Sequence, residues 1–209
     1  MESLKSFRNW MFIVIAVLFI FSFSIHKEGH KSDIHLLPQQ LQTGDIILRN
    51  SNGMLASFFR NMSKQDKRYS HAGFIVVGNK TWVCHYIDNE NGNGLIAEEL
   101  KDFVNEHKCN AYGVYRFPLT EAERGKLDYI ISNDIQHPVA FDEKFDLQTD
   151  DKLYCTEWIS KSLWNAAHIK IPVTASEMME YIALDNLYIN SGSRMIAVDQ
   201  YQNKNIVNK

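Results

Sequence analysis

The stretch YCTEWI at residues 154–159 places Cys155 at the start of a helix-like pattern, directly after an irregular acidic segment. Far upstream, the stretch SHAGFIVV at residues 70–77 predicts a strand that carries His71. A thiol at a helix terminus and an imidazole that takes its proton are the parts of a nucleophilic cysteine site. Because the two residues lie far apart in sequence, only the fold can bring them together.

Strand patterns dominate the first half of the chain, and the longest helix patterns follow them. We predict strands at 44–48 with its entry turn, 70–77, 81–87, 95–98, 112–117 and 194–198. We predict helices at 54–62, 102–106, 120–133, 155–167 and 176–184. Asn-Gly pairs between residues 89 and 94 predict a hairpin turn. This order favours the α+β class with an antiparallel sheet.

The length of 209 residues predicts one domain, or one domain with an appendage. We place the domain at 41–202, after a polar linker at 26–40 and before a frayed tail at 203–209. The net charge of −3 gives no electrostatic case for nucleic-acid binding. The chain has no CxxC pair and no Cys/His spacing of the zinc type, so we expect no metal and no organic cofactor.

The first residues of the chain differ from the rest. Lys5 and Arg8 precede an apolar run at 10–21, an order that resembles an export signal. We expect residues 1–25 to be such a signal, with cleavage after Ser24, or an uncleaved membrane anchor that gives membrane contact. Either alternative sends the following domain out of the cytoplasm, to the periplasm or the cell envelope.

The other two cysteines have ordinary structural explanations. Cys84 lies in an apolar strand pattern and is predicted to be a small core residue, whereas Cys109 is predicted to lie in a loop. A lone Cys155 in a helix is also commonly a buried core residue, but its position at a helix start favours thiolate formation. Cys155 is therefore the candidate nucleophile.

A histidine base needs a partner that orients its second ring nitrogen. His85 on the next strand is the first candidate, because pairing through a turn at 78–80 puts His71 opposite Tyr86 and His85 one step away. A surface strand residue is the structural alternative for His85. Three aspartates, at positions 45, 142 and 146, are alternative partners for His71.

Two groups are candidates for holding a developing oxyanion. The backbone amide of Cys155 is unpaired at a helix start, and the hydroxyl of Tyr154 precedes it directly. Tyr154 can equally bind substrate, or serve only as an amphipathic packing residue.

Three motifs in order carry a family resemblance: LQTGDIIL at 41–48, SHAGF at 70–74 and YCTEW at 154–158. Together they resemble the permuted NlpC/P60 cysteine hydrolases of the YiiX/YaeF type, which are papain-like and related to lecithin:retinol acyltransferase. The resemblance implies a circularly permuted papain-like fold: an antiparallel sheet or small barrel with the nucleophile helix packed on it. It also implies Cys155 as nucleophile, His71 as base and His85 as the third polar residue.

Two positions bear on the branch of the family. Thr156 stands where serine is usual, and His85 stands where many YiiX-like members carry glutamate and the acyltransferase branch carries histidine. The resemblance implies an exported cysteine hydrolase that cleaves an amide in a cell-wall peptide. A lipid acyl hydrolase or acyltransferase with the same cysteine is the first alternative, and a non-catalytic binding module on this fold is the second.

Overall fold

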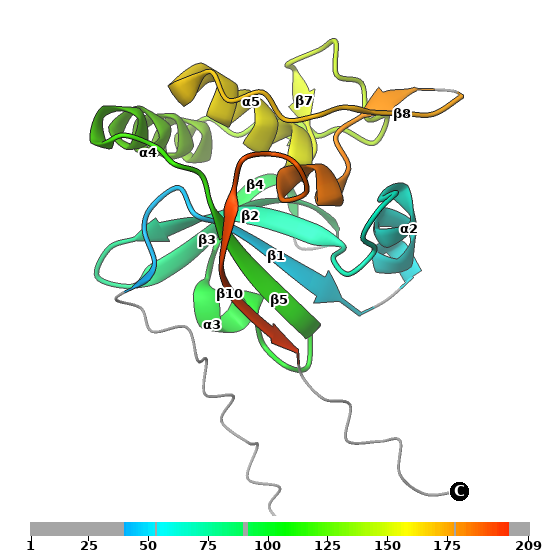
Figure 1. Ribbon diagram of the computed structural model, residues 1–209, viewed down its shortest axis with the longest axis horizontal. Helices are drawn as coiled ribbons and strands as arrows, with labels where there is room; N and C mark the ends of the chain where they lie inside the picture. The colour runs from blue at the N-terminus through cyan, green and yellow to red at the C-terminus, as the bar shows by residue number, and fades with distance from the viewer. Residues whose placement is uncertain (1–39, 53, 90–91, 178, 201–209) are drawn as a thin grey trace, which may run out of the picture. The chain divides into compact units, whose positions relative to one another are not determined.

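Six alternating apolar segments pair into one antiparallel sheet in the computed structural model (Figure 1). The strand order is β10-β5-β1-β2-β3-β4, and every neighbouring pair is antiparallel. The strands are β1 (Ile46–Ser51), β2 (His71–Val77), β3 (Thr81–Asn89), β4 (Gly92–Glu99), β5 (Cys109–Arg116) and β10 (Arg194–Gln200). The predicted α+β class with an antiparallel sheet is confirmed.

The structure describes residues 40–52, 54–89, 92–177 and 179–200. The predicted signal or anchor at 1–25, the linker except for its last residue, and the tail at 203–209 lie outside these residues. The tip of the predicted hairpin, residues 90 and 91, also lies outside them. Among the described residues, no helix has both the length and the apolar character needed to cross a bilayer.

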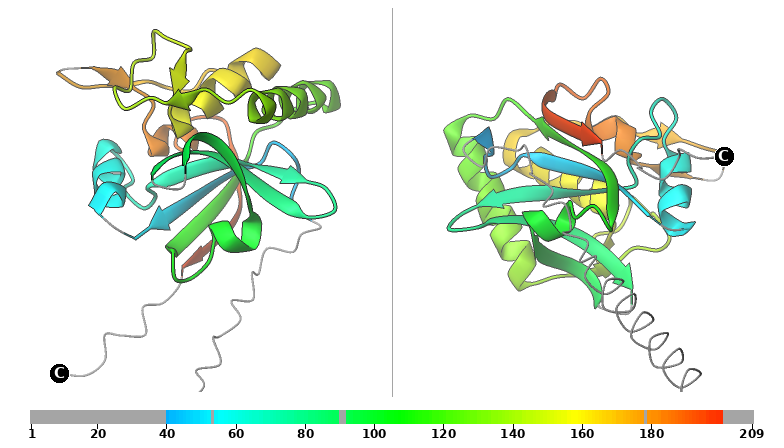
Figure 2. Two further views of the ribbon diagram at one scale, coloured as in Figure 1. Left: turned by 180° about the vertical axis from the view of Figure 1, so that it is seen from behind. Right: turned by 90° about the horizontal axis from the view of Figure 1, so that it is seen from below.

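Helices cover the two faces of the sheet unequally (Figures 1 and 2). The long helices α4 (Glu121–Gln136) and α5 (Cys155–Ala167) lie over one face, where Phe74 and Trp158 belong to the same apolar core. The short α3 (Leu100–Phe103) lies against the other face, in a second core with Ile75 and Val83. Strand residues therefore alternate between two cores, as a period of two requires.

Local sequence sets where the two long helices begin. At the start of α4, Thr120 and Glu123 form the predicted capping box, with Glu123 Oε2 accepting from the Thr120 amide at 2.8 Å. Helix α5 begins at Cys155 as predicted, where Glu157 accepts from the Tyr154 amide at 3.4 Å. It ends at Ala167 because His168 adopts the left-handed conformation that closes helices, with φ of 55°.

Some predicted elements differ from those observed. The helix predicted at 176–184 is instead a small hairpin, β8 (Thr174–Ala175) with β9 (Glu180–Tyr181), followed by the 3-10 helix η2 (Leu184–Leu187). The Ser176 hydroxyl accepts from the Met179 amide at 3.1 Å, a local bond that competes with helix formation. The short helix predicted at 102–106 is α3, which begins and ends earlier.

The prediction that Cys109 is a loop residue is wrong. It is the first residue of β5 and is fully buried, and its thiol donates to the Ala111 carbonyl at 3.0 Å. The prediction that Cys84 is a core residue is confirmed, because it is buried in β3. Helix α2 (Met54–Met62) has the bounds that its sequence predicts. The remaining strands, β6 (Ala140–Phe141) and β7 (Lys152–Leu153), pair in parallel before α5.

The register between β2 and β3 positions the histidines. All three turn residues at 78–80 lie outside the ladder, so Val77 pairs with Thr81 and Phe74 pairs with Cys84. This register differs by one residue from the predicted pairing of His71 with Tyr86. Gly73 then lies beside His85, since a Cβ on Gly73 would be 3.0 Å from His85 Cβ and 2.6 Å from the Cys84 carbonyl oxygen.

This close approach gives a stability prediction. We expect Gly73→Ala to lower the free energy of unfolding by about 1–3 kcal/mol, because the backbone of β3 must shift to admit a methyl group. Urea unfolding followed by circular dichroism measures the change. The matched control is Gly125→Ala in α4, where a Cβ meets nothing within 4 Å and is expected to add roughly 1 kcal/mol. Equal effects of the two variants would contradict the packing argument.

Candidate active site

Cys155 lies where strands β2 and β3 part. It is the first residue of α5, and its side chain is buried beside the start of β2. The backbone amides of Ala72, Thr156 and Cys155 itself donate toward its sulfur. The β2–β3 pairing ends at Phe74, so the amide of Ala72 faces the thiol rather than continuing that ladder. Helix terminus and strand end thus converge on one sulfur atom.

Burial dominates the acidity of this thiol. It raises the pKa of Cys155 to about 11, although the three amides act in the opposite direction. The amides at the helix start do lower the pKa of this thiol, as the sequence predicts, but burial outweighs them. The few orphan amides do not offset the cost of placing a charge away from water. At neutral pH Cys155 is a thiol, so the predicted nucleophilic role requires a base that removes its proton.

His71 and His85 form a direct pair, as the sequence predicted that they could. His71 Nε2 and His85 Nδ1 are 2.8 Å apart, with the two rings nearly perpendicular at 85°. Gly73, two residues after His71 on β2, lies on the same face of the sheet and beside His85. Burial, then His85, then Arg49 hold the pKa of His71 well below its usual range, so its ring is neutral. A neutral imidazole can accept a proton.

A carboxylate and two cations complete the surroundings of the histidine pair. Glu98 Oε2 lies 3.3 Å from His85 Nε2, although the ring N–H does not point straight at the oxygen. Lys108 Nζ lies 2.9 Å from the other oxygen of Glu98, and Arg49 Nη1 lies 3.7 Å from Oε2. Sequence reasoning gave Glu98 no role. The strand period could have indicated it. Ile96 pairs with His85, and Glu98, two residues later on β4, lies on the same face of the sheet.

Cys155 and His71 line the same cleft, which has a volume of about 450 Å³. One wall is aromatic and consists of Phe58, Phe59 and Phe145, which contact one another edge to face or at a tilt. Phe145 adopts a left-handed backbone conformation with φ of 57°, which is strained for a bulky residue. The cleft therefore places the predicted nucleophile and base beside an apolar wall.

The three aspartates proposed as alternative partners of His71 have other contacts. Asp45 is buried and pairs with Arg116 at 2.6 Å. Asp142 accepts from the Lys144 amide at 2.9 Å and from the Asp146 amide at 2.6 Å, so it shapes the loop that presents Phe145. The third, at position 146, accepts from the Gln148 amide. Each of these contacts supports the scaffold.

Tyr154 is buried, and its hydroxyl accepts from the Ile182 amide at 2.8 Å. Thr156 donates to the Ile182 carbonyl at 2.6 Å, so both neighbours of Cys155 bind the same segment. Tyr154 lines a small apolar cavity next to Cys155 rather than the larger cleft. These contacts anchor the start of α5. The Tyr154 hydroxyl already accepts one hydrogen bond and can still donate its own proton, so its oxyanion role stays a prediction.

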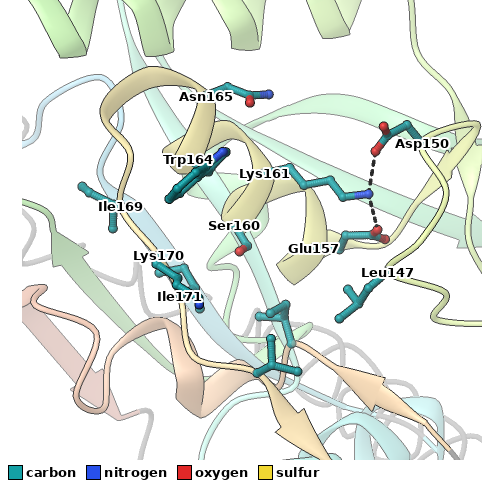
Figure 3. Close-up of a pocket in the computed structure, with 12 residues that line it drawn as sticks. Leu147, Asp150, Glu157, Ser160, Lys161, Trp164, Asn165, Ile169, Lys170 and Ile171 are labelled. Atoms are coloured by element: carbon teal, nitrogen blue, oxygen red, sulfur yellow. Dashed lines mark hydrogen bonds and ion pairs between the residues drawn. The ribbon is translucent and has the colours of Figure 1, made fainter.

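A second hollow lies along the outer side of α5 (Figure 3). There Lys161 bridges Asp150 at 2.6 Å and Glu157 at 2.8 Å, with Trp164 nearby on the same helix. None of the predicted catalytic residues lines it. The Cys155 cleft is therefore the candidate active site.

The acidity of Cys155 gives a pH prediction. Because only the thiolate is a strong nucleophile, alkylation by iodoacetamide should keep rising from about pH 7 to about pH 10 instead of levelling off near neutrality. Mass spectrometry of the labelled peptides measures the rate at each cysteine. Cys84 and Cys109 serve as internal controls, because both are buried and neither lines the cleft. A rate for Cys155 that is already maximal at pH 7 would show that its pKa is low.

Comparison with solved structures finds the same fold elsewhere. The crystal structure of the metalloprotein YiiX from Escherichia coli O157:H7 matches with a TM-score of 0.63 and 19% sequence identity, over 77% of this chain and 99% of that one. Among the described residues of the present chain, no group of three or more His, Cys, Asp or Glu side chains is arranged to hold a metal ion. A search of curated proteins found no match.

A family model covers nearly the whole described region. The model for the permuted papain-like amidases, the YaeF/YiiX or C92 peptidase family, matches residues 40–202. This span includes the parted strands, the histidine pair and the cysteine helix. The chain therefore belongs to the permuted papain-like amidase family of the YaeF/YiiX type.

Proposed function

We propose that this protein hydrolyses an amide bond with Cys155 as nucleophile and His71 as base. One observation carries the proposal: His71 uses Nε2 to contact His85, so its Nδ1 is the nitrogen left for a proton transfer in the cleft that Cys155 shares. A nucleophile, a base and an orienting group for the base form the general pattern of cysteine hydrolysis. Membership of an amidase family agrees with an amide as the bond cleaved.

The reaction has two halves. In the first, His71 takes the thiol proton while the sulfur attacks the carbonyl carbon, and the protonated imidazole then gives that proton to the leaving amine. A thioester to Cys155 results. In the second, His71 takes a proton from water, the hydroxide attacks the thioester, and the proton returns to the departing sulfur. The amide of Cys155 is the proposed donor to the oxyanion in both halves.

In this mechanism Cys155 and His71 are both uncharged at the start. Burial raises the pKa of Cys155 and lowers the pKa of His71, so Cys155 is a thiol and His71 is a neutral imidazole before substrate arrives. Proton transfer then accompanies the attack, and His71 contributes as a general base rather than as a permanent counter-ion. The proposed substrate is an amide in a cell-wall peptide outside the cytoplasm. The location rests on the basic and apolar sequence of residues 1–25.

The aromatic wall favours a second candidate, an acyl-lipid substrate. Phe58, Phe59 and Phe145 offer an apolar surface next to Cys155, and the side chain of Phe58 is half exposed. An acyl chain gains free energy by covering such a surface. In this alternative the same cysteine takes the acyl group from a lipid and passes it to water or to another acceptor.

Replacement of the nucleophile tests both candidates. We expect Cys155→Ala to abolish turnover of peptidoglycan fragments, since no other cysteine lines the cleft. The amide products are measured by liquid chromatography with mass spectrometry, and circular dichroism checks that the variant folds. Cys109→Ala is the matched control and should keep its activity. Release of fatty acid from phospholipids, without cleavage of peptides, would support the lipid candidate instead. Activity that survives Cys155→Ala would refute both.

The two histidines should contribute unequally. His71→Ala removes the base, whose loss is typically worth about 10²–10⁴-fold in kcat. His85→Ala removes a residue that contacts the base through one hydrogen bond, so we expect a smaller loss. Steady-state kinetics on the substrate that the Cys155→Ala experiment identifies measures the loss in kcat for each variant. A larger loss for His85→Ala would reverse the proposed roles.

A further inference from the structure

Glu98 lies directly behind the histidine pair, and the mechanism above does not use it. Its contact with His85, the hydrogen bond to Lys108 and the charge of Arg49 lower the pKa of this carboxyl to about 2. The carboxylate is therefore ionised at any ordinary pH and can only accept hydrogen bonds. It faces His85 Nε2, the ring nitrogen that is not used by His71.

Two neutral histidines do not by themselves fix the direction of the bond between them. In one arrangement His71 Nε2–H donates to His85 Nδ1, and His71 Nδ1 keeps a free lone pair. In the other, His85 Nδ1–H donates to His71 Nε2, and His71 Nδ1 carries the proton instead. Only the first arrangement leaves His71 able to take a proton from the thiol. The 2.8 Å contact accommodates both arrangements equally.

We propose that Glu98 is a positioning residue that selects the productive arrangement. Its negative charge holds a proton on His85 Nε2, which leaves His85 Nδ1 as an acceptor and makes His71 Nε2 the donor. His71 Nδ1 is then unprotonated. The inference rests on the proposed function, in which His71 is the base for Cys155. When His71 gains a proton during the reaction, the same carboxylate stabilises the positive charge through His85.

The surroundings of Glu98 hold its carboxylate in place. Lys108 follows α3 and donates to Oε1, while Arg49 reaches from β1 toward Oε2. Arg49 is itself fixed, because it donates to the Phe103 carbonyl at 2.8 Å and lies 4.1 Å from the centre of the Phe103 ring. The Phe103 ring also packs against both histidines. Arg49 from β1, the neutral His85 from β3 and Lys108 from the α3–β5 connection therefore meet at one carboxylate.

Nitrogen-15 NMR of histidine-labelled protein tests the proposal without substrate. Two-bond proton–nitrogen spectra distinguish the two neutral tautomers, and spectra of His71→Asn and His85→Asn assign the signals. We expect the wild-type protein near pH 7 to show His71 protonated at Nε2 only. A wild-type His71 that is protonated at Nδ1 would overturn the proposal, whatever the variants do.

Charge removal gives the second test. Glu98→Gln keeps the size of the side chain, but an amide both donates and accepts, so it does not select one direction. We expect mixed tautomers at His71 and a roughly 10-fold slower reaction of Cys155 with iodoacetamide, less than a full loss of the base would cause. Glu99→Gln is the matched control on the same strand. Glu99 pairs with Lys80 and Lys101 instead, so both readouts should stay as in the wild type.

The outcomes separate this inference from the proposed function. Unchanged tautomers in Glu98→Gln would show that the histidine pair orders itself and that Glu98 is structural only. Turnover by Cys155→Ala would instead refute the cysteine mechanism, and it would leave the tautomer result intact because that measurement needs no catalysis.

Discussion

The position of the cysteine helix depends on one buried side chain, Trp158. Its ring lies edge to face with Phe74 at 5.1 Å and with Tyr86 at 5.8 Å, so it joins α5 to both β2 and β3. Its indole N–H donates to Asp134 at 2.8 Å, which ties α5 to α4 as well. Aromatic burial on this scale dominates local packing energy, and a satisfied indole N–H avoids a desolvation cost. Cys155, one turn before Trp158, is thereby held at the place where the two strands part.

Burial acts on both the proposed nucleophile and the proposed base. It makes the thiol a weaker acid and the imidazole a weaker base, so a thiolate–imidazolium pair is disfavoured before substrate binds. Behind the histidine pair, Glu98 is ionised and is paired with Lys108. A neutral thiol and a neutral imidazole, with a fixed negative charge behind the histidine pair, suit the proposed mechanism, in which charge develops only during the reaction.

Local sequence predicted the bounds of several helices and strands. The bounds of α2 and α5 follow from helical periodicity, and the start of α4 follows from Thr120 and Glu123. Where a local hydrogen bond competed with periodicity, the prediction was wrong, as at the Ser176 hairpin. The turn at 78–80 was predicted correctly, but the pairing drawn from it was wrong by one residue, since a three-residue turn pairs Val77 with Thr81 and therefore places His71 opposite Ile87 rather than Tyr86.

By itself, the sequence determined that a cysteine begins a helix, that histidines lie on two neighbouring strands and that the motif order is that of a permuted papain-like fold. These features depend on spacing and residue type, which the chain displays directly. Only the tertiary structure decided the acidity of Cys155, the hydrogen bond between His71 and His85, and the place of Glu98 behind them. Each of these depends on distance and burial, which arise when strands far apart in sequence pair and helix α5 covers them.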